Sequence, residues 1–154
     1  MRLTLISVGR LKSGPEKTLV DDYVSRFRKA GRALGFRGFD LIDVDSGGGL
    51  DAEGERLLAK LPKGARILRL DEHGEQMASK RFADHLARLR DQGTPDLVFL
   101  IGGAEGYSQA VRAAAPDTLA FGPQTWPHRL VKVMLAEQVY RAASLLAGLP
   151  YHKA

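Results

Sequence analysis

Apolar residues along the chain recur in two alternating patterns. Short continuous runs rich in β-branched and aromatic residues are typical of strands buried on both faces. Between them, apolar residues spaced by three and four are typical of helices with one buried side. The continuous runs predict strands over residues 3–8, 39–44, 65–70 and 96–101, and a brief one over 118–121.

Helices are predicted between these strands, and the first begins at Pro15 because proline suits the first turn of a helix. Gly31 and Gly35 are expected to end it. The others are a short helix through Leu57, Leu58 and Leu61, a helix with Phe82, Leu86 and Leu89 on one face, a short one broken near Pro116, and a last helix over 128–147. This alternation predicts one α/β domain over residues 1–154, with a mostly parallel sheet covered by helices on both faces.

The last predicted helix is apolar over an unusually wide arc. A helix of this kind must be buried on more than one side. In so small a chain, the second burying surface is expected to be another subunit. The apolar residues are Leu130, Val131, Val133, Met134, Leu135, Val139, Ala142, Ala143, Leu145 and Leu146.

Composition narrows the possible chemistry. The chain has 154 residues, 44% of them apolar, and no cysteine, which excludes disulfides, a thiolate nucleophile and cysteine-bound zinc. Its four histidines show no metal-ligand spacing, so no metal site is expected. No apolar run is long enough for a signal peptide or a membrane span, and a cytoplasmic protein is expected.

Positive charge gathers in residues 10–37. This segment holds eight basic and three acidic residues, so it alone accounts for the formal net charge of +5. A one-sided basic surface attracts polyanions and speeds encounter with them. A nucleic-acid partner is therefore predicted, and a solvated helix face that only aids solubility is the alternative.

One glycine motif fits the dinucleotide-binding pattern by spacing. Residues 47–52 match G-x-G-x-x-A after a strand, and Asp71 follows about 20 residues later, where a ribose-binding acid is expected. The helix that follows carries Asp51, Glu53 and Glu55 in its first turns, and these charges repel a pyrophosphate. We interpret the motif as a surface loop and keep a dinucleotide oxidoreductase as an alternative.

Two loops rich in glycine and proline follow predicted strands, at residues 102–106 and 122–128. In open α/β sheets, ligands bind at the carboxyl ends of strands, where these loops lie. Adjacent glycines in the first loop allow the backbone to approach a ligand closely, and prolines stiffen the second. A ligand site is predicted here, and two ordinary turns are the alternative.

These loops also carry a resemblance to a known family. The motifs are Leu100-Ile101-Gly102-Gly103-Ala104-Glu105-Gly106, the stretch from Thr125 to Ala142, and the terminal Pro150-Tyr151-His152-Lys153. They resemble the SPOUT-class pseudouridine methyltransferases of large-subunit rRNA, which are small trefoil-knotted enzymes. Weaker similarity at residues 5–9 and Leu70-Asp71 extends the resemblance over essentially the whole chain. Ala104 stands where relatives often have proline, and Trp126 where they have leucine or phenylalanine.

The resemblance implies S-adenosylmethionine as methyl donor and N3 of a pseudouridine in helix 69 of 23S rRNA as acceptor. It also implies a homodimer that acts on the assembled ribosome, with a trefoil knot in the C-terminal part of the chain. The cofactor is then expected in a knotted pocket lined by Leu70, Gly102, Gly103, Gly122, Pro123, Gln124, Thr125, Trp126 and Pro127.

Methyl transfer from a sulfonium needs donor and acceptor in line and a group that takes the proton of the acceptor nitrogen. His128 is the predicted group, because the N-terminus of a helix disfavours the imidazolium form. A hydrogen bond from His128 to a uracil carbonyl, or a purely capping role, is the alternative. Glu137 and Arg141 are predicted to form an i, i+4 pair, and Arg141 is a candidate for holding a phosphate or base.

The chain's end and its basic segment complete the predicted site. Tyr151 and His152 are expected to stack on and pair with an extruded nucleotide, as part of a site that includes the partner subunit. Arg26, Lys29 and Arg32 are the predicted phosphate contacts. A non-catalytic, ribosome-associated RNA-binding factor explains the same basic segment, but it does not need the loops at 102 and 122 to bind a cofactor.

Overall fold

A computed structural model describes residues 1–153 and the side chains of residues 1–151. It contains a five-stranded sheet in the order β2-β1-β4-β3-β5, in which every pairing is parallel. The strands are β1 (Arg2–Val8), β2 (Gly38–Val44), β3 (Arg66–Leu70), β4 (Asp96–Ile101) and β5 (Thr118–Leu119). The predicted strands are all confirmed, and the last is shorter than expected.

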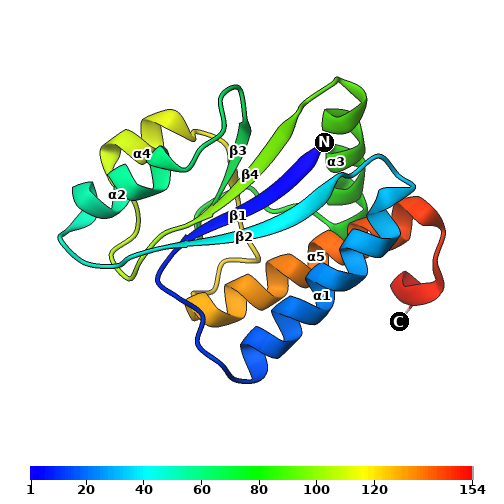
Figure 1. Cartoon of the computed structure of the whole chain (residues 1–154), viewed down its shortest axis with the longest axis horizontal. Helices are drawn as coiled ribbons and strands as arrows, with labels where there is room; N and C mark the ends of the chain where they lie inside the picture. The colour runs from blue at the N-terminus through cyan, green and yellow to red at the C-terminus, as the bar shows by residue number, and fades with distance from the viewer. Residues whose placement is uncertain (154) are drawn as a thin grey trace.

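Helices cover both faces of this sheet, as predicted (Figure 1). They are α1 (Pro15–Arg32), α2 (Leu50–Ala59), α3 (Ser79–Asp91), α4 (Gln109–Ala114) and α5 (His128–Ala147), followed by a 3-10 helix, η1 (Pro150–Lys153). α1, α3 and α5 lie on one face, and α2 and α4 lie on the other.

The alternating side chains of the central strands supply both halves of the core. In β4, Leu97 and Phe99 pack with the α1, α3 and α5 layer, whereas Val98 and Leu100 pack with α2 and α4. All four are fully buried. A strand buried on both faces has no polar side to alternate with, which is why these strands read as continuous apolar runs.

The strand order determines which loops meet. β2 and β3 follow each other in the chain, but β1 and β4 separate them in the sheet. β4, β3 and β5 are neighbours, so the loops after these three strands converge at one edge. The predicted ligand loops, 102–106 and 122–128, are therefore brought together.

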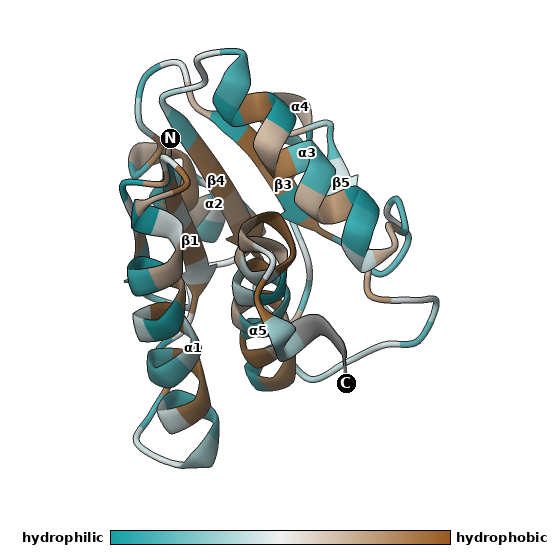
Figure 2. Ribbon diagram, turned by 90° about the vertical axis from the view of Figure 1, so that its right-hand side faces the viewer, coloured by the Kyte–Doolittle hydropathy of each residue, from teal (hydrophilic) through white to brown (hydrophobic). Residues whose placement is uncertain are grey.

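The last helix is buried on only one side within the chain. α5 packs between α1 and α3 through residues such as Leu135 and Val139, which are inaccessible. Leu130 remains 41% exposed, and Val133 and Met134 are only partly covered. Figure 2 shows the hydrophobic residues on the strands and along α5. The wide apolar arc therefore extends beyond what this chain buries.

Gly54 has a structural reason that the sequence did not reveal. It lies in the middle of α2, where glycine lowers helix propensity. A Cβ at this position would stand 2.3 Å from Ser108 Oγ and 3.2 Å from Val111 Cγ2. The glycine thus allows α2 to pack closely against α4. In residues 1–153, none of the helices has the length and apolarity needed to cross a membrane.

Candidate cofactor site

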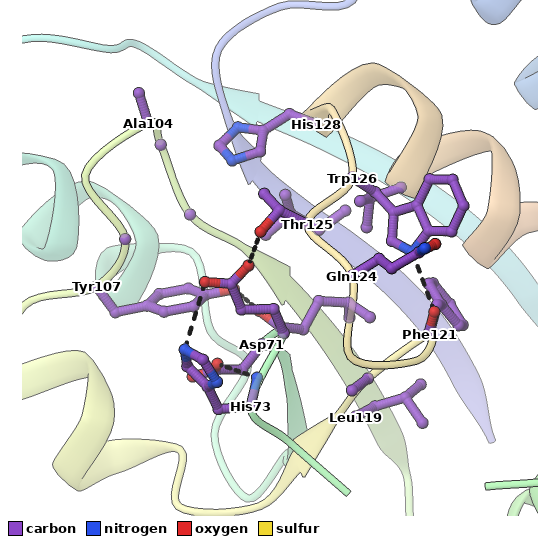
Figure 3. A pocket seen from close by; sticks show the side chains of 18 of the residues that line it. Asp71, His73, Ala104, Tyr107, Leu119, Phe121, Gln124, Thr125, Trp126 and His128 are labelled. Carbon is purple, nitrogen blue, oxygen red and sulfur yellow. Dashed lines mark hydrogen bonds and ion pairs between the residues drawn. The ribbon is translucent and has the colours of Figure 1, made fainter. Parts of the chain in front are cut away.

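A pocket of about 390 Å³ opens at the carboxyl ends of β3, β4 and β5 (Figure 3). The loops after these strands line it, together with the first turn of α5. Of the predicted cofactor residues, it includes Leu70, Gly102, Gly103, Gly122, Gln124, Thr125 and Trp126, and His128 also lines it. Pro123 and Pro127 belong to the same loop but do not line the pocket. The two predicted loops thus form one site.

The first loop folds into a tight turn that only glycine fits. A Cβ on Gly102 would stand 2.7 Å from the Gly106 carbonyl oxygen and 3.0 Å from Tyr107 Cε1. Gly106 has a φ of +91° and donates its amide to Gly103 at 3.1 Å. Positive φ is strained for residues with a side chain. The turn therefore brings bare backbone to the pocket surface.

The second loop is held by two side-chain hydrogen bonds. Thr125 donates its hydroxyl to the Glu72 carboxylate, which belongs to the loop after β3. Trp126 donates its indole Nε1–H to the Phe121 carbonyl at 3.0 Å and stays 36% exposed. Both bonds are drawn in Figure 3. They fix the 122–127 backbone across the mouth of the pocket.

Tyr107 lies in the floor of the pocket and was not predicted as a site residue. Its hydroxyl lies 2.6 Å from the carbonyl oxygen of Leu70 and 2.9 Å from that of Leu100. These two residues lie near the carboxyl ends of β3 and β4. Burial raises the pKa of Tyr107, so its hydroxyl remains a proton donor. The side chain thereby holds the ends of two strands at the spacing that shapes the pocket.

A charged pair lies beside this tyrosine. Arg69 is 6% exposed, and its Nη1 stands 2.5 Å from Asp71 Oδ2. Its Nε donates to the Ala115 carbonyl at 3.1 Å. Although burial acts to raise the pKa of Asp71, the hydrogen bond from the His73 amide and the nearby Arg69 charge hold it below its usual value. A stable negative charge therefore lines the pocket.

The structure separates Asp71 from the dinucleotide-like loop at residues 47–52. Asp71 follows β3 and that loop follows β2, and two strands lie between them. The Glu53 carboxylate accepts the Gly47 amide at 2.8 Å, so the protein's own anion caps this loop. Arg56 donates to the Gly47 carbonyl at 2.7 Å. These contacts favour the surface-loop interpretation over the dinucleotide site.

His128 begins α5 at the mouth of the pocket, as predicted. Partial burial and the charge of Lys132 lower the pKa of His128 below 6.5, which favours the neutral imidazole. Lys132 is itself buried, and its ammonium donates to the Gly9 carbonyl at 3.0 Å and lies 3.5 Å from Asp43. These contacts fix the first turns of α5 against the ends of β1 and β2.

Three other predicted catalytic residues form a separate cluster, with Glu137 and Arg141 in α5 and Tyr151 in η1. Arg141 Nη2 lies 2.7 Å from Glu137 Oε1, which confirms the predicted i, i+4 pair. Tyr151 donates its hydroxyl to the same oxygen at 2.9 Å, and burial raises its pKa. Arg141 comes thirteen positions after His128, or roughly 20 Å along a helix. These residues therefore do not lie beside His128 within one chain. The side chain of His152, the remaining predicted catalytic residue, lies outside the described residues.

The three predicted RNA contacts on α1 do not form one compact group. Arg26 Nε is 3.1 Å from Asp22, and its guanidinium lies 5.9 Å from the Tyr140 ring centroid, toward α5. Lys29 is exposed, and Arg32 lines a separate hollow near β2. Over the described part of the chain, no group of three histidine, aspartate or glutamate side chains is arranged to hold a metal ion.

Comparison with known proteins identifies the family of this chain. The family model described as "Predicted SPOUT methyltransferase" matches residues 1–152. The chain is 63% identical over its whole length to the full-length "Ribosomal RNA large subunit methyltransferase H" of Hyphomonas neptunium. It is 52% identical to the protein of the same name from Dinoroseobacter shibae, covering 99% of both chains.

A solved structure, the SpoU methyltransferase AviRb of Streptomyces viridochromogenes in complex with AdoMet, is 16% identical with a TM-score of 0.40. This match covers 90% of this chain and 56% of that one. The family model and the full-length relatives instead confirm the predicted family. They also confirm the predicted class of methyl donor, because the family is one of methyltransferases. The chain belongs to the SPOUT methyltransferase family.

Proposed function

We propose that this protein transfers the methyl group of S-adenosylmethionine to N3 of a pseudouridine in helix 69 of 23S rRNA, within the assembled ribosome. The pocket at the ends of β3, β4 and β5 carries the proposal, because its walls are the loops that the family resemblance assigns to the cofactor. The name shared by the full-length relatives supports rRNA of the large subunit as substrate. A ribosomal substrate places the activity in the cytoplasm.

The residues of the pocket fit a cofactor of this kind. Its volume of about 390 Å³ lies in the range of small-molecule sites. The bare backbone at Gly102 lets a ligand approach closely, where a Cβ would fill the space. S-adenosylmethionine carries a positive sulfonium, and Asp71, Glu72 and Glu105 place carboxylates around the pocket. Arg112 also lines the pocket and provides a partner for the cofactor's carboxylate.

The bound cofactor supplies an electrophilic methyl group on its sulfonium. The protein then has to align the acceptor nitrogen with that methyl group and remove the N3 proton. We assign the proton to His128, because its neutral imidazole stands at the pocket mouth. Arg141, Tyr151 and His152 are assigned to holding the nucleotide, with Glu137 orienting Arg141 through their 2.7 Å contact.

We infer that this site is shared between two copies of the chain. Within one chain, the pocket lies at the first turn of α5, and Arg141 lies roughly 20 Å further along the helix. A groove of about 500 Å³ runs along the exposed side of α5 and is lined by Leu19, Val133 and Met134. Burial of that groove in a homodimer would cover the apolar arc and bring one subunit's tail toward the other's pocket.

The backbone also supports the expected knot. Gln76, in the connection from β3 to α3, pairs in parallel with Ala120 beyond β5. α5 then packs between α1 and α3. We infer that the chain beyond residue 121 passes through the loop formed by residues 71–78. This threading would hold the pocket loops together.

Methyl transfer to ribosomes from cells that lack this protein tests the proposal. Purified protein with labelled S-adenosylmethionine should label 23S rRNA, and mass spectrometry should place the methyl group on a pseudouridine of helix 69. Titration calorimetry with S-adenosylmethionine distinguishes the enzyme from a non-catalytic RNA-binding factor. No heat of binding at millimolar cofactor would favour the factor, and label on another nucleotide would correct the acceptor.

The proposed role of His128 predicts a pH dependence. Because burial and the Lys132 charge lower the pKa of His128, the neutral imidazole is favoured at neutral pH, and protonation removes the base as the pH falls through the lowered pKa. Single-turnover rates should therefore level off above the lowered pKa of His128 and drop only as the pH falls through it, at a more acidic pH than for an ordinary histidine. His128→Asn should slow the reaction by about 100-fold or more and lose this limb, while cofactor affinity is retained. An unchanged profile in the variant would assign His128 a capping role.

A further inference from the structure

A second basic site lies at the opposite edge of the sheet from the pocket. Arg2 of β1, Arg28 and Arg32 of α1, and Arg37 before β2 surround a hollow of about 470 Å³, which we call the arginine hollow. They come from three separate segments of the chain, and the fold brings them together at the amino ends of β1 and β2.

The charge of the arginine hollow is only partly compensated. Its lining contains one acid, Asp40, which is 2.9 Å from Arg2 Nη1 and 3.5 Å from Arg28 Nη2. Arg28 also donates to the Phe39 carbonyl at 2.8 Å. Among the described residues, the guanidinium groups of Arg32 and Arg37 contact no acid or carbonyl within hydrogen-bond distance, and both residues are exposed. Two unpaired guanidinium groups therefore face solvent across one concavity.

The chemistry of this hollow fits phosphate groups. Guanidinium groups bind phosphate oxygens through two parallel N–H bonds, which suits arginine better than lysine for this task. The one large apolar side chain in the lining, Phe36, is only 2% exposed, so the hollow offers no hydrophobic surface to a protein partner. A polyanion that contributes charge alone is the partner that this surface matches.

We propose that the arginine hollow binds the phosphate backbone of rRNA at a place distinct from the methylated nucleotide. This inference rests on the proposed function, since it takes rRNA as the substrate. The seven residues of β1 separate the hollow from the pocket edge by roughly 20 Å. A phosphate bound here therefore lies too far from the pocket of the same subunit to take part in its reaction, and it orients the enzyme on its substrate.

The test is the salt dependence of binding to unmethylated ribosomes and to purified 23S rRNA, measured with Arg32→Gln/Arg37→Gln. The double variant should bind ribosomes and rRNA about 10-fold more weakly at physiological salt. The slope of its log K against log salt should be smaller than that of the wild type by between about 1 and 2. The matched control is Lys60→Gln/Lys63→Gln, which removes two exposed charges at the end of α2 and in the turn after it. It should leave the slope unchanged.

Two further measurements separate this inference from the function on which it rests. S-adenosylmethionine affinity and the thermal midpoint report whether the double variant is folded, and Arg32→Lys/Arg37→Lys should recover the slope but only part of the affinity. The inference would be overturned by an unchanged slope in Arg32→Gln/Arg37→Gln, or by an equal loss of affinity in the control Lys60→Gln/Lys63→Gln. A loss of affinity for ribosomes but not for purified rRNA would also overturn it. If the wild type binds rRNA with a steeper salt dependence than the Gln variant but transfers no methyl group, the proposed function fails. The assignment of the arginine hollow to phosphate binding then still holds.

Discussion

A dimer built from one His128→Asn chain and one Arg141→Gln chain is expected to recover at least about half of the wild-type rate, although each variant alone is nearly inactive. In the shared site, the pocket of one subunit works with the tail of the other. The mixed dimer then has one site with both substitutions and one site with neither. Two different affinity tags allow the mixed dimer to be purified and its methyl transfer to ribosomes to be measured.

The reciprocal dimer provides the control. It pairs a wild-type chain with a chain that carries both substitutions, so a shared site leaves each pocket with one damaged component and little activity. If each chain instead builds a complete site, the results reverse: the reciprocal dimer keeps about half of the rate and the first mixed dimer has none. Cofactor affinity should stay normal in every Arg141→Gln chain, because Arg141 is assigned to the nucleotide and not to the cofactor.

The local features of this fold could be predicted from sequence because they depend on neighbouring residues. Buried parallel strands require continuous apolar runs, and Pro15 opens α1 where expected. The two glycine-bearing loops could also be assigned to one edge, since parallel strands place all their carboxyl ends together. The predicted cofactor loops accordingly line one pocket, although Pro123 and Pro127 are not among its lining residues.

Features that depend on the order of the strands in the sheet could not be predicted from the sequence. Tyr107 reaches the Leu70 carbonyl, 37 residues away, only because β3 and β4 are neighbours. The spacing of the 47–52 loop and Asp71 imitated a dinucleotide site, but the order of the sheet separates them. The basic segment looked continuous in sequence, yet α1 turns Arg26 toward α5 and Arg32 toward β2.

Gly102→Ala should weaken S-adenosylmethionine binding by about 100-fold, because the added methyl group meets backbone that has nowhere to move. The Cβ would stand 2.7 Å from the Gly106 carbonyl oxygen and 3.0 Å from the Tyr107 ring. Relief of that overlap must displace the 102–106 turn or the tyrosine that holds Leu70, and both form the pocket. Such overpacking typically also costs about 1–3 kcal/mol of folding stability.

A substitution at a second glycine distinguishes a loss of folding stability from damage to the pocket. Gly93 lies in the turn before β4, has a φ of +81° and has open space where a Cβ would be added. Gly93→Ala should therefore lower the thermal midpoint through backbone strain and leave cofactor affinity unchanged. Calorimetric titration of both variants below their unfolding temperatures makes the comparison. If Gly102→Ala binds the cofactor as tightly as the wild type, the 102–106 turn does not form the cofactor's binding surface.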